Sequence, residues 1–167
     1  RDPLDLSFLM RTCVNGIMRI NAAGEFNNSF HLSRKGMEPK RFAGVVQKWH
    51  RAIRGVEFRH GDFAETVADA TKGDFAYLDP PYAGNKQRYS GNLDSERLFE
   101  VLDDLNRRGV KWALSYDGWR DETDLTLPVP RELYKQCMRL ESGHSAVAKV
   151  LSKGALQAVA ESLYLNY

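Results

Sequence analysis

The sequence predicts an α/β fold built around a largely parallel sheet. Two observations support this prediction. From residue 56 onward, apolar runs of strand length alternate with segments whose apolar residues recur at helical spacing. Such alternation is typical of strand–helix–strand units, in which a crossover helix holds two strands parallel. The second observation is size, because 167 residues, 43% of them hydrophobic, are enough to form a buried core.

Three segments are expected in the N-terminal third. Residues 4–13 carry apolar side chains at helical spacing and predict a helix. Residues 15–30 are rich in the turn formers Asn and Gly and predict a loop or a hairpin with polar tips. Pro39 can open a helix at its first turn. The apolar residues that follow form one stripe as far as Ile53, and Gly55 ends the helix.

The alternation of strands and helices occupies the middle of the chain. Asp94 is a suitable helix cap, and the leucines after it lie on one face of a longer helix. The expected elements are a strand at 56–60, a helix at 63–70, a buried strand at 74–78, a helix at 94–108 and a strand at 110–115. The pattern is looser after Asp117, where we expect strands at 125–129, 132–140 and 161–167, and a mobile loop at 143–154.

Composition excludes several classes of protein. With 28% charged residues, six prolines and thirteen glycines, the chain is neither collagen-like nor disordered. It has no run of about 18 apolar residues that could form a membrane-spanning helix. Cys13 and Cys137 are too few for a disulfide framework, so a reducing, cytoplasmic location is expected. Neither the cysteines nor the four histidines have the spacing of a metal site, and we expect no metal.

The net charge of +2 hides an uneven distribution of charge. Residues 1–59 carry eleven Lys and Arg against five Asp and Glu, whereas residues 60–167 carry thirteen against seventeen. A basic part joined to an acidic part indicates that a polyanion docks on the first part. A solvated charged face is the alternative explanation.

The sharpest chemical signal is the sequence Asp79-Pro80-Pro81-Tyr82, directly after the strand expected at 74–78. Two prolines lock the backbone and remove two N–H donors, so the carbonyl of Pro80 is held rigidly. A carboxylate, a fixed carbonyl and an aromatic ring suit a planar amine that has two N–H groups and a ring to stack. A plain turn after a strand is the alternative.

This set of groups can activate a poor nucleophile. The lone pair of an amine conjugated to a purine is delocalised into the ring. Two acceptors on its protons let the nitrogen become pyramidal, and they act most strongly as charge develops in the transition state. Alignment with an electrophilic methyl group would complete the reaction.

The motif resembles the catalytic motif of amino-directed, S-adenosylmethionine-dependent methyltransferases. Residues 8–27, 112–118 and 161–167 resemble, in the same order, segments of the Dam-type (D12 class) DNA adenine-N6 methyltransferases. The resemblance implies a Rossmann-like methyltransferase fold. It also implies transfer of a methyl group from S-adenosylmethionine to a flipped-out adenine in double-stranded DNA, in a restriction-modification or other phage or bacterial DNA modification system.

The resemblance also implies roles for individual residues. The catalytic residues are Asp79, Pro80, Pro81 and Tyr82, and the cofactor-binding residues are Asp62, Phe63 and Asp79. The DNA-binding residues are Asn15 and Arg19 toward the bases, Tyr89 near the flipped base, and Arg11, Arg34, Lys35, Lys40 and Arg41 toward phosphates. The alternatives are a helix cap for Asp62, core packing for Phe63, a turn for Asn15, phosphate or solvent contact for Arg19 and surface packing for Tyr89.

The chain departs from the family pattern in one important respect. It lacks the Phe-x-Gly-x-Gly turn and the lysine-bearing Gly-Gly-Lys segment that bind the methionine end of the cofactor. We therefore expect an incomplete fold, with residues 1–54 forming part of a DNA-recognition region and residues 55–167 the C-terminal part of the catalytic domain. A companion polypeptide or a further N-terminal segment would supply the glycine turn, and the isolated chain would be inactive.

Two smaller departures concern recognition of the DNA sequence. Val14 stands where the family has an aromatic residue, and Asn28-Ser29 replace the usual Val-Pro. Two other functions stay open from the sequence alone. One is methylation of a base in ribosomal RNA, and the other is a non-catalytic DNA-binding fragment or subunit.

Overall fold

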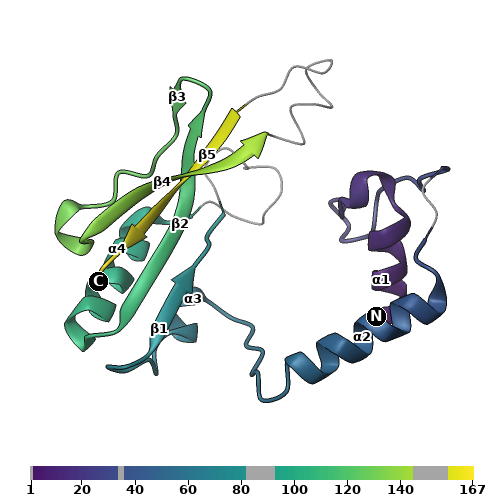
Figure 1. Cartoon of the computed structure of the whole chain (residues 1–167), viewed down its shortest axis with the longest axis horizontal. Helices are drawn as coiled ribbons and strands as arrows, with labels where there is room; N and C mark the ends of the chain where they lie inside the picture. The colour runs from purple at the N-terminus through teal and green to yellow at the C-terminus, as the bar shows by residue number, and fades with distance from the viewer. Residues whose placement is uncertain (1, 34–35, 82–92, 145–157) are drawn as a thin grey trace. The chain divides into compact units, whose positions relative to one another are not determined.

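The chain forms two compact units, Arg1–Phe58 and Arg59–Tyr167. The computed structural model in Figure 1 describes residues 2–33, 36–81, 93–144 and 158–167. Within these ranges, no helix is both long enough and apolar enough to cross a membrane.

The first unit begins with helix α1 (Pro3–Thr12), as the apolar spacing predicts. Asp2 caps it by accepting a hydrogen bond from the amide of Leu4 at 2.8 Å. A short 3-10 turn, η1 (Val14–Gly16), follows. The predicted Asn/Gly-rich loop is then closed by antiparallel bridges, Cys13 to Phe30 and Ile20 to Phe26. The loop-or-hairpin prediction is confirmed.

Helix α2 (Pro39–Ala52) begins at the predicted proline. Glu38 caps it by accepting from the amides of Lys40 and Arg41 at 2.9 and 2.8 Å. Gly55 follows with a φ of 80°, a left-handed conformation that a glycine adopts without strain. No residue of α2 is buried.

The second unit is built on a mixed sheet with strand order β1-β2-β5-β4, and β3 pairs with β2 off this path. The strands are β1 (Phe75–Leu78), β2 (Lys111–Arg120), β3 (Thr123–Asp124), β4 (Gln136–His144) and β5 (Ala158–Leu165). β1 and β2 are parallel, whereas β5 is antiparallel to both β2 and β4. The prediction of a largely parallel sheet is therefore wrong. Helix α4 (Ser95–Arg108) is the crossover that parallel strands require, and it joins only β1 to β2.

Helix α4 confirms its prediction in detail. Asp94 caps it by accepting from the amide of Arg97 at 3.1 Å, and Gly109 ends it with a φ of 71°. Three leucines of α4 pack on the sheet, each at most 1% exposed. Full burial of each such side chain stabilises the folded state by about 1.5–3 kcal/mol. This interface belongs to the apolar core of the unit. The core consists of Leu98, Leu102, Leu105, Val110, Trp112, Leu114, Leu78, Val129, Leu133 and Tyr164.

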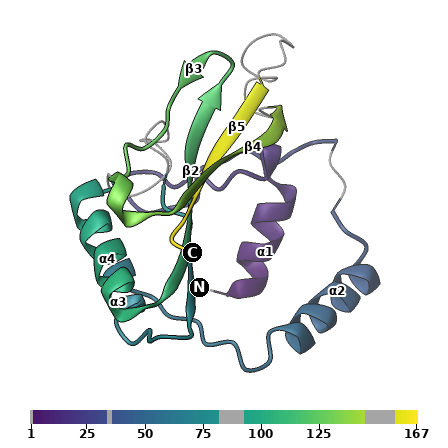
Figure 2. The same ribbon diagram turned by 60° about the vertical axis from the view of Figure 1, so that its left-hand side comes forward.

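The helix predicted at 63–70 is shorter than expected. Helix α3 covers Phe63–Thr66 and gives way to turns. The guanidinium of Arg108 donates to the carbonyls of Val67, Ala68 and Ala70, at 2.7 Å for Ala70. A side chain from α4 thus satisfies carbonyls that a longer helix would have bonded internally. Helices α3 and α4 cover the same face of the sheet (Figure 2).

Two predicted strands do not form. Residues 56–60 have no strand structure, because no strand among the described residues pairs with them to complete a ladder. Residues 125–129 are also irregular, since Pro128 cannot donate to a ladder and the amide of Val129 bonds the carbonyl of Leu127 at 2.8 Å. Val129 is instead buried in the core, with Leu127 packed against it.

The strand predicted at 74–78 forms as β1 but is not buried along its length. Leu78 is buried, whereas Phe75 and Tyr77 are 55% and 61% exposed. Ala76 and Leu78 face the core under α4, so the two aromatic side chains point to the other face of the sheet.

The later elements agree in part with their predictions. The segment 132–140 is divided between η3 (Arg131–Leu133) and β4, while 161–167 lies largely in β5. Most of the loop predicted at 143–154 lies outside the described residues.

Candidate active site

Asp79 lies at the carboxyl edge of the parallel strand pair. The last paired residues of β1 and β2 are Leu78 and Leu114, so Asp79 and Ser115 are the next residues along the two strands. The hydroxyl of Ser115 donates a hydrogen bond to Oδ1 of Asp79 at 3.1 Å. Ser115 is buried and Asp79 is exposed. In α/β sheets, ligands bind outside this edge of the strands.

The rest of the motif continues from Asp79 into a loop. Pro80 is half-buried and Pro81 is exposed. Neither has an N–H, so both leave only carbonyl oxygens for a ligand. Tyr82 and Tyr89 lie outside the described residues.

Asp62 and Phe63 begin helix α3. Oδ1 of Asp62 accepts from the amide of Ala64 at 2.9 Å and from Nη2 of Arg97 at 2.8 Å. The guanidinium of Arg97 also lies 5.6 Å from the centre of the Phe63 ring, which packs against the core. Both structural alternatives considered for these residues are therefore present, a helix cap and a core ring.

The topology brings this pair to the same edge as Asp79. A crossover helix runs back along the sheet, so its first turn lies at the carboxyl edge of the strand before it. Arg97 belongs to the first turn of α4, and its ion pair holds Asp62 there. The side chain of Asp62 is 32% exposed, and its Oδ2 has no hydrogen-bond partner among the described residues. It can therefore accept a hydrogen bond from a ligand.

A β-bulge lies two residues beyond Ser115. The register of β2 against β5 shifts between Asp117 and Trp119. At Gly118, an added Cβ would overlap the carbonyl of Ala160, so only glycine fits without movement. Bulges re-aim strands beside many active sites.

Sequence reasoning assigned no role to Ser115 or Gly118. The signal for Ser115 was a polar residue at the end of an apolar strand next to the one that carries Asp79. It could not be used without knowing the register of the two strands.

The residues proposed to contact DNA belong to the first unit. Arg11 lies in the last turn of α1, Asn15 lies in η1, and the exposed Arg19 lies in the following loop. The side-chain amide of Asn28 donates to the carbonyls of Val14 and Ile17 at 3.1 and 2.7 Å. Asn28, at one of the positions that depart from the family, therefore holds the loop that carries Asn15 and Arg19.

The basic candidates after this loop are described only in part. Lys40 and Arg41 are exposed in the first turn of α2. Arg34 and Lys35 lie outside the described residues.

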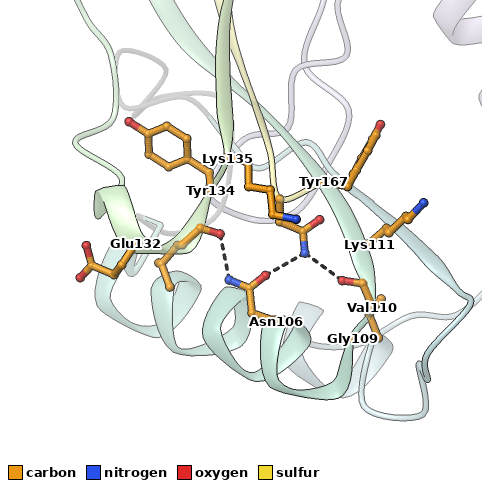
Figure 3. A pocket seen from close by; sticks show the side chains of 10 residues that line it. Asn106, Gly109, Val110, Lys111, Glu132, Tyr134, Lys135 and Tyr167 are labelled. Carbon is orange, nitrogen blue, oxygen red and sulfur yellow. Dashed lines mark hydrogen bonds between the residues drawn. The ribbon is translucent and has the colours of Figure 1, made fainter.

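A cavity of about 460 Å³ opens at the opposite edge of the sheet, lined by Lys111, Lys135, Tyr134 and Tyr167 among others (Figure 3). Its polar floor is already bonded, because Asn106 contacts the carbonyl of Leu133 and the side chain of Asn166. None of the candidate catalytic or cofactor-binding residues lines this cavity.

Comparison with known proteins identifies the family. Residues 1–150 match the D12 class of N6 adenine-specific DNA methyltransferases. The chain belongs to this family. Its relatives in the D12 class take their methyl group from S-adenosylmethionine.

Three relatives illustrate the match. The DNA N-6-adenine-methyltransferase of Escherichia phage P1 is 33% identical over 136 residues, which is 76% of this chain and 17% of the phage protein. The type II methyltransferase M1.LlaDCHI of Lactococcus lactis subsp. cremoris is 25% identical over 96% of this chain and 58% of its own length. The DNA adenine methylase of Serratia marcescens is 34% identical over 66% of this chain and 40% of its own length. This D12-class chain thus spans less than two thirds of each of these relatives.

Proposed function

We propose that this chain carries the base-activating part of a DNA adenine-N6 methyltransferase. The reaction is transfer of a methyl group from S-adenosylmethionine to the amino group of a flipped adenine in duplex DNA, in a restriction-modification or other phage or bacterial modification system. One observation carries the proposal. In a chain of the D12 class, Asp79 and the two prolines follow β1 at the carboxyl edge of the parallel strand pair.

The residues of the motif would divide the work on the adenine. The carboxylate of Asp79 accepts one amino N–H and the carbonyl of Pro80 accepts the other. The nitrogen lone pair would then be available to attack a methyl carbon. As the N–C bond forms, the bond from that carbon to sulfur would break and leave its electron pair on sulfur, and the surplus proton of N6 would pass to water. The ring of Tyr82 stacks on the base. Removing the base from the duplex costs a few kcal/mol, which contacts in the pocket offset.

Asp62 and Phe63 are proposed to hold the nucleoside end of the cofactor, and Asp79 borders its reactive end. When bound, S-adenosylmethionine supplies an electrophilic methyl group on a sulfonium. The available acceptor on Asp62 and the neighbouring ring fit a nucleoside, which presents hydroxyl donors and a planar base. The methionine end needs the glycine turn, which these 167 residues do not contain.

A further segment is proposed to complete a Rossmann-like fold. Among the described residues, β1 pairs with β2 on one side and has no strand on the other. Phe75 and Tyr77 are exposed on the face opposite α4. A segment that carries the glycine turn, in the same polypeptide or in a companion chain, would add a strand to this edge, and other parts of that segment would cover these rings.

Residues 1–54 are proposed to form part of the DNA-recognition region and residues 55–167 the C-terminal part of the catalytic domain. The excess of positive charge in residues 1–59 supports a polyanionic partner for the first region. Asn15 and Arg19 would read base edges. The proposed phosphate contacts are Arg11, Arg34, Lys35, Lys40 and Arg41, and Tyr89 would lie near the flipped base.

The test is a tritiated-methyl transfer assay on duplex DNA, with the intact mass of every polypeptide in the sample. We expect label in adenine when the glycine-turn segment is present, and a loss of at least about 100-fold in Asp79→Ala, since the acceptor acts mainly in the transition state. Asp103→Asn, a change at an exposed surface ion pair of α4, is the control and keeps full activity. Label in ribosomal RNA but not in DNA, or DNA binding without transfer, would reject the proposal in favour of the two other functions.

A further inference from the structure

The carboxylate of Asp79 is held by a neighbour on the adjacent strand. The hydroxyl of Ser115 donates to Oδ1 of Asp79 at 3.1 Å. Within the described residues, the side chain of Asp79 has no other hydrogen bond. We propose that Ser115 is a positioning residue, which fixes Oδ1 so that Oδ2 is presented to the substrate amine. This inference rests on the proposed function of Asp79.

The two residues differ in how firmly they are held. Ser115 is 5% exposed and lies between Leu114 and Tyr116, which are 0% and 3% exposed, in the middle of β2. β5 pairs with this part of β2, and Ser115 lies opposite Leu163 of β5. Asp79 is exposed beyond the last paired residue of β1. An exposed Asp side chain at the end of a strand samples several rotamers, and a bond from a buried partner selects one of them.

The direction of the hydrogen bond is set by chemistry. An ionised carboxylate is only an acceptor, so the hydroxyl must donate. The bond therefore uses lone-pair capacity on Oδ1 and leaves Oδ2 able to accept an N–H from the substrate. Because Ser115 stands on a strand and not on a loop, it holds the acceptor with the precision that a catalytic geometry requires.

Loss of this bond should affect the chemical step more than binding. A misplacement of about 1 Å can reduce a rate by about 100-fold. For Ser115→Ala in the complete enzyme, we expect kcat to fall by about 10- to 100-fold. The KM values for DNA and for S-adenosylmethionine should change less than about two-fold, since Ser115 contacts Asp79 and is not proposed to contact either substrate.

Ser162→Ala is the matched control. Ser162 is also a buried serine, on the neighbouring strand β5, and its hydroxyl donates to the carbonyl of Tyr116 at 3.3 Å. We expect this variant to keep the wild-type kcat despite a similar loss of stability. Ser115→Thr retains the hydroxyl and should restore at least half of kcat. Ser115→Cys, whose side chain has a similar size and is a weaker hydrogen-bond donor, takes the place of Ser115→Ala as the test variant if the alanine variant does not fold.

The kinetics are paired with a readout that does not depend on activity. NMR couplings that report χ1 of Asp79 should indicate one rotamer in the wild type and in Ser162→Ala, but averaging in Ser115→Ala. The inference is overturned if Ser115→Ala has the wild-type kcat and one Asp79 rotamer, or if the two alanine variants lose kcat equally. Full activity of Asp79→Ala would reject the proposed function itself, so the two failures are distinguishable.

Discussion

Asn106 and Asn166, sixty residues apart in the sequence, share a hydrogen bond of 2.7 Å that joins helix α4 to the end of the chain beyond β5. Asn106 also accepts from the indole N–H of Trp112 at 2.9 Å and donates to the carbonyl of Leu133 at 2.8 Å. Asn166 donates further to the carbonyl of Val110 at 2.9 Å. One pair of amides therefore connects α4, β2, η3 and the C-terminal residues around the apolar core.

Replacing Asn106 by Ala removes three of these bonds together. Each is worth about 1 kcal/mol net, and buried groups left unpaired cost about 1–3 kcal/mol more, so we expect the free energy of unfolding to fall by about 3 kcal/mol or more. Urea denaturation followed by tryptophan fluorescence measures it. The control is Arg107→Ala on the next residue, whose exposed ion pairs contribute less than about 1 kcal/mol. Equal losses in both variants would contradict the role given to the amide pair.

Gly118 is expected to tolerate no side chain. In Gly118→Ala, the new Cβ would overlap backbone atoms of Ala160 on β5, and backbone cannot rotate away as a flexible side chain can. Overpacking of this kind costs about 1–3 kcal/mol, and the bulge beside Asp79 would shift. Thermal unfolding measures the loss. In Gly61→Ala, the nearest atom is a side-chain oxygen of Glu65 at 3.4 Å, and we expect a change within about 0.5 kcal/mol. A similar small change for Gly118→Ala would show that the bulge accommodates the methyl group.

Tyr164 should make the second unit sensitive to alkali. Burial raises the pKa of its phenol from the ordinary 10.0 to about 12. Because the folded-state pKa is the higher one, the associated stability is complete below pH 10 and is lost as the pH rises toward 12.

The variant Tyr164→Phe isolates this effect. It loses the hydrogen bond to the carbonyl of Leu127, 2.8 Å in the structure, and should be less stable at pH 8 by about 1 kcal/mol. The difference between the two proteins should shrink or reverse between pH 10 and 12. Urea unfolding at several pH values measures it, and a constant difference would show that Tyr164 ionises as freely in the folded chain as in the unfolded one.

Elements with strong local signals could be predicted from the sequence. Helix α4 has a capping Asp94, a terminal Gly109 and leucines at helical spacing, and each signal acts within one or two turns. Residues 56–60 and 125–129 have the composition of strands, but a strand exists only if another strand bonds to it. The direction of β5, which enters between β2 and β4, likewise depends on pairing between distant segments.

The same distinction applies to the candidate site. The position of Asp79 beyond a strand followed from its own neighbours in the sequence. Its bond to Ser115 joins residues 36 apart and depends on the register of β1 against β2, which no local pattern specifies. For Asp62, the sequence allowed a helix cap or a cofactor acceptor. The structure shows the cap and leaves the second oxygen of the carboxylate available, so one residue can serve in both roles.

The variant Asp62→Asn separates these two roles. Asn caps a helix as well as Asp does, so its Oδ1 can still accept from the amide of Ala64 and α3 should stay folded. The available acceptor Oδ2 becomes an NH₂ donor, which cannot accept from a nucleoside hydroxyl. We expect the Kd for S-adenosylmethionine, measured by calorimetry on the complete enzyme, to rise by about tenfold or more, as for a lost hydrogen bond to a charged group.

The ion pair with Arg97 is also lost in this variant, and Asp69→Asn controls for that loss. Asp69 pairs with Arg59 at 2.8 Å on the surface, so its variant removes a comparable ion pair and leaves Asp62 intact. Cofactor affinity should be unchanged in Asp69→Asn. If the two variants bind the cofactor equally well, Asp62 acts only as a cap, and the nucleoside must find its acceptor on another residue at this edge of the sheet.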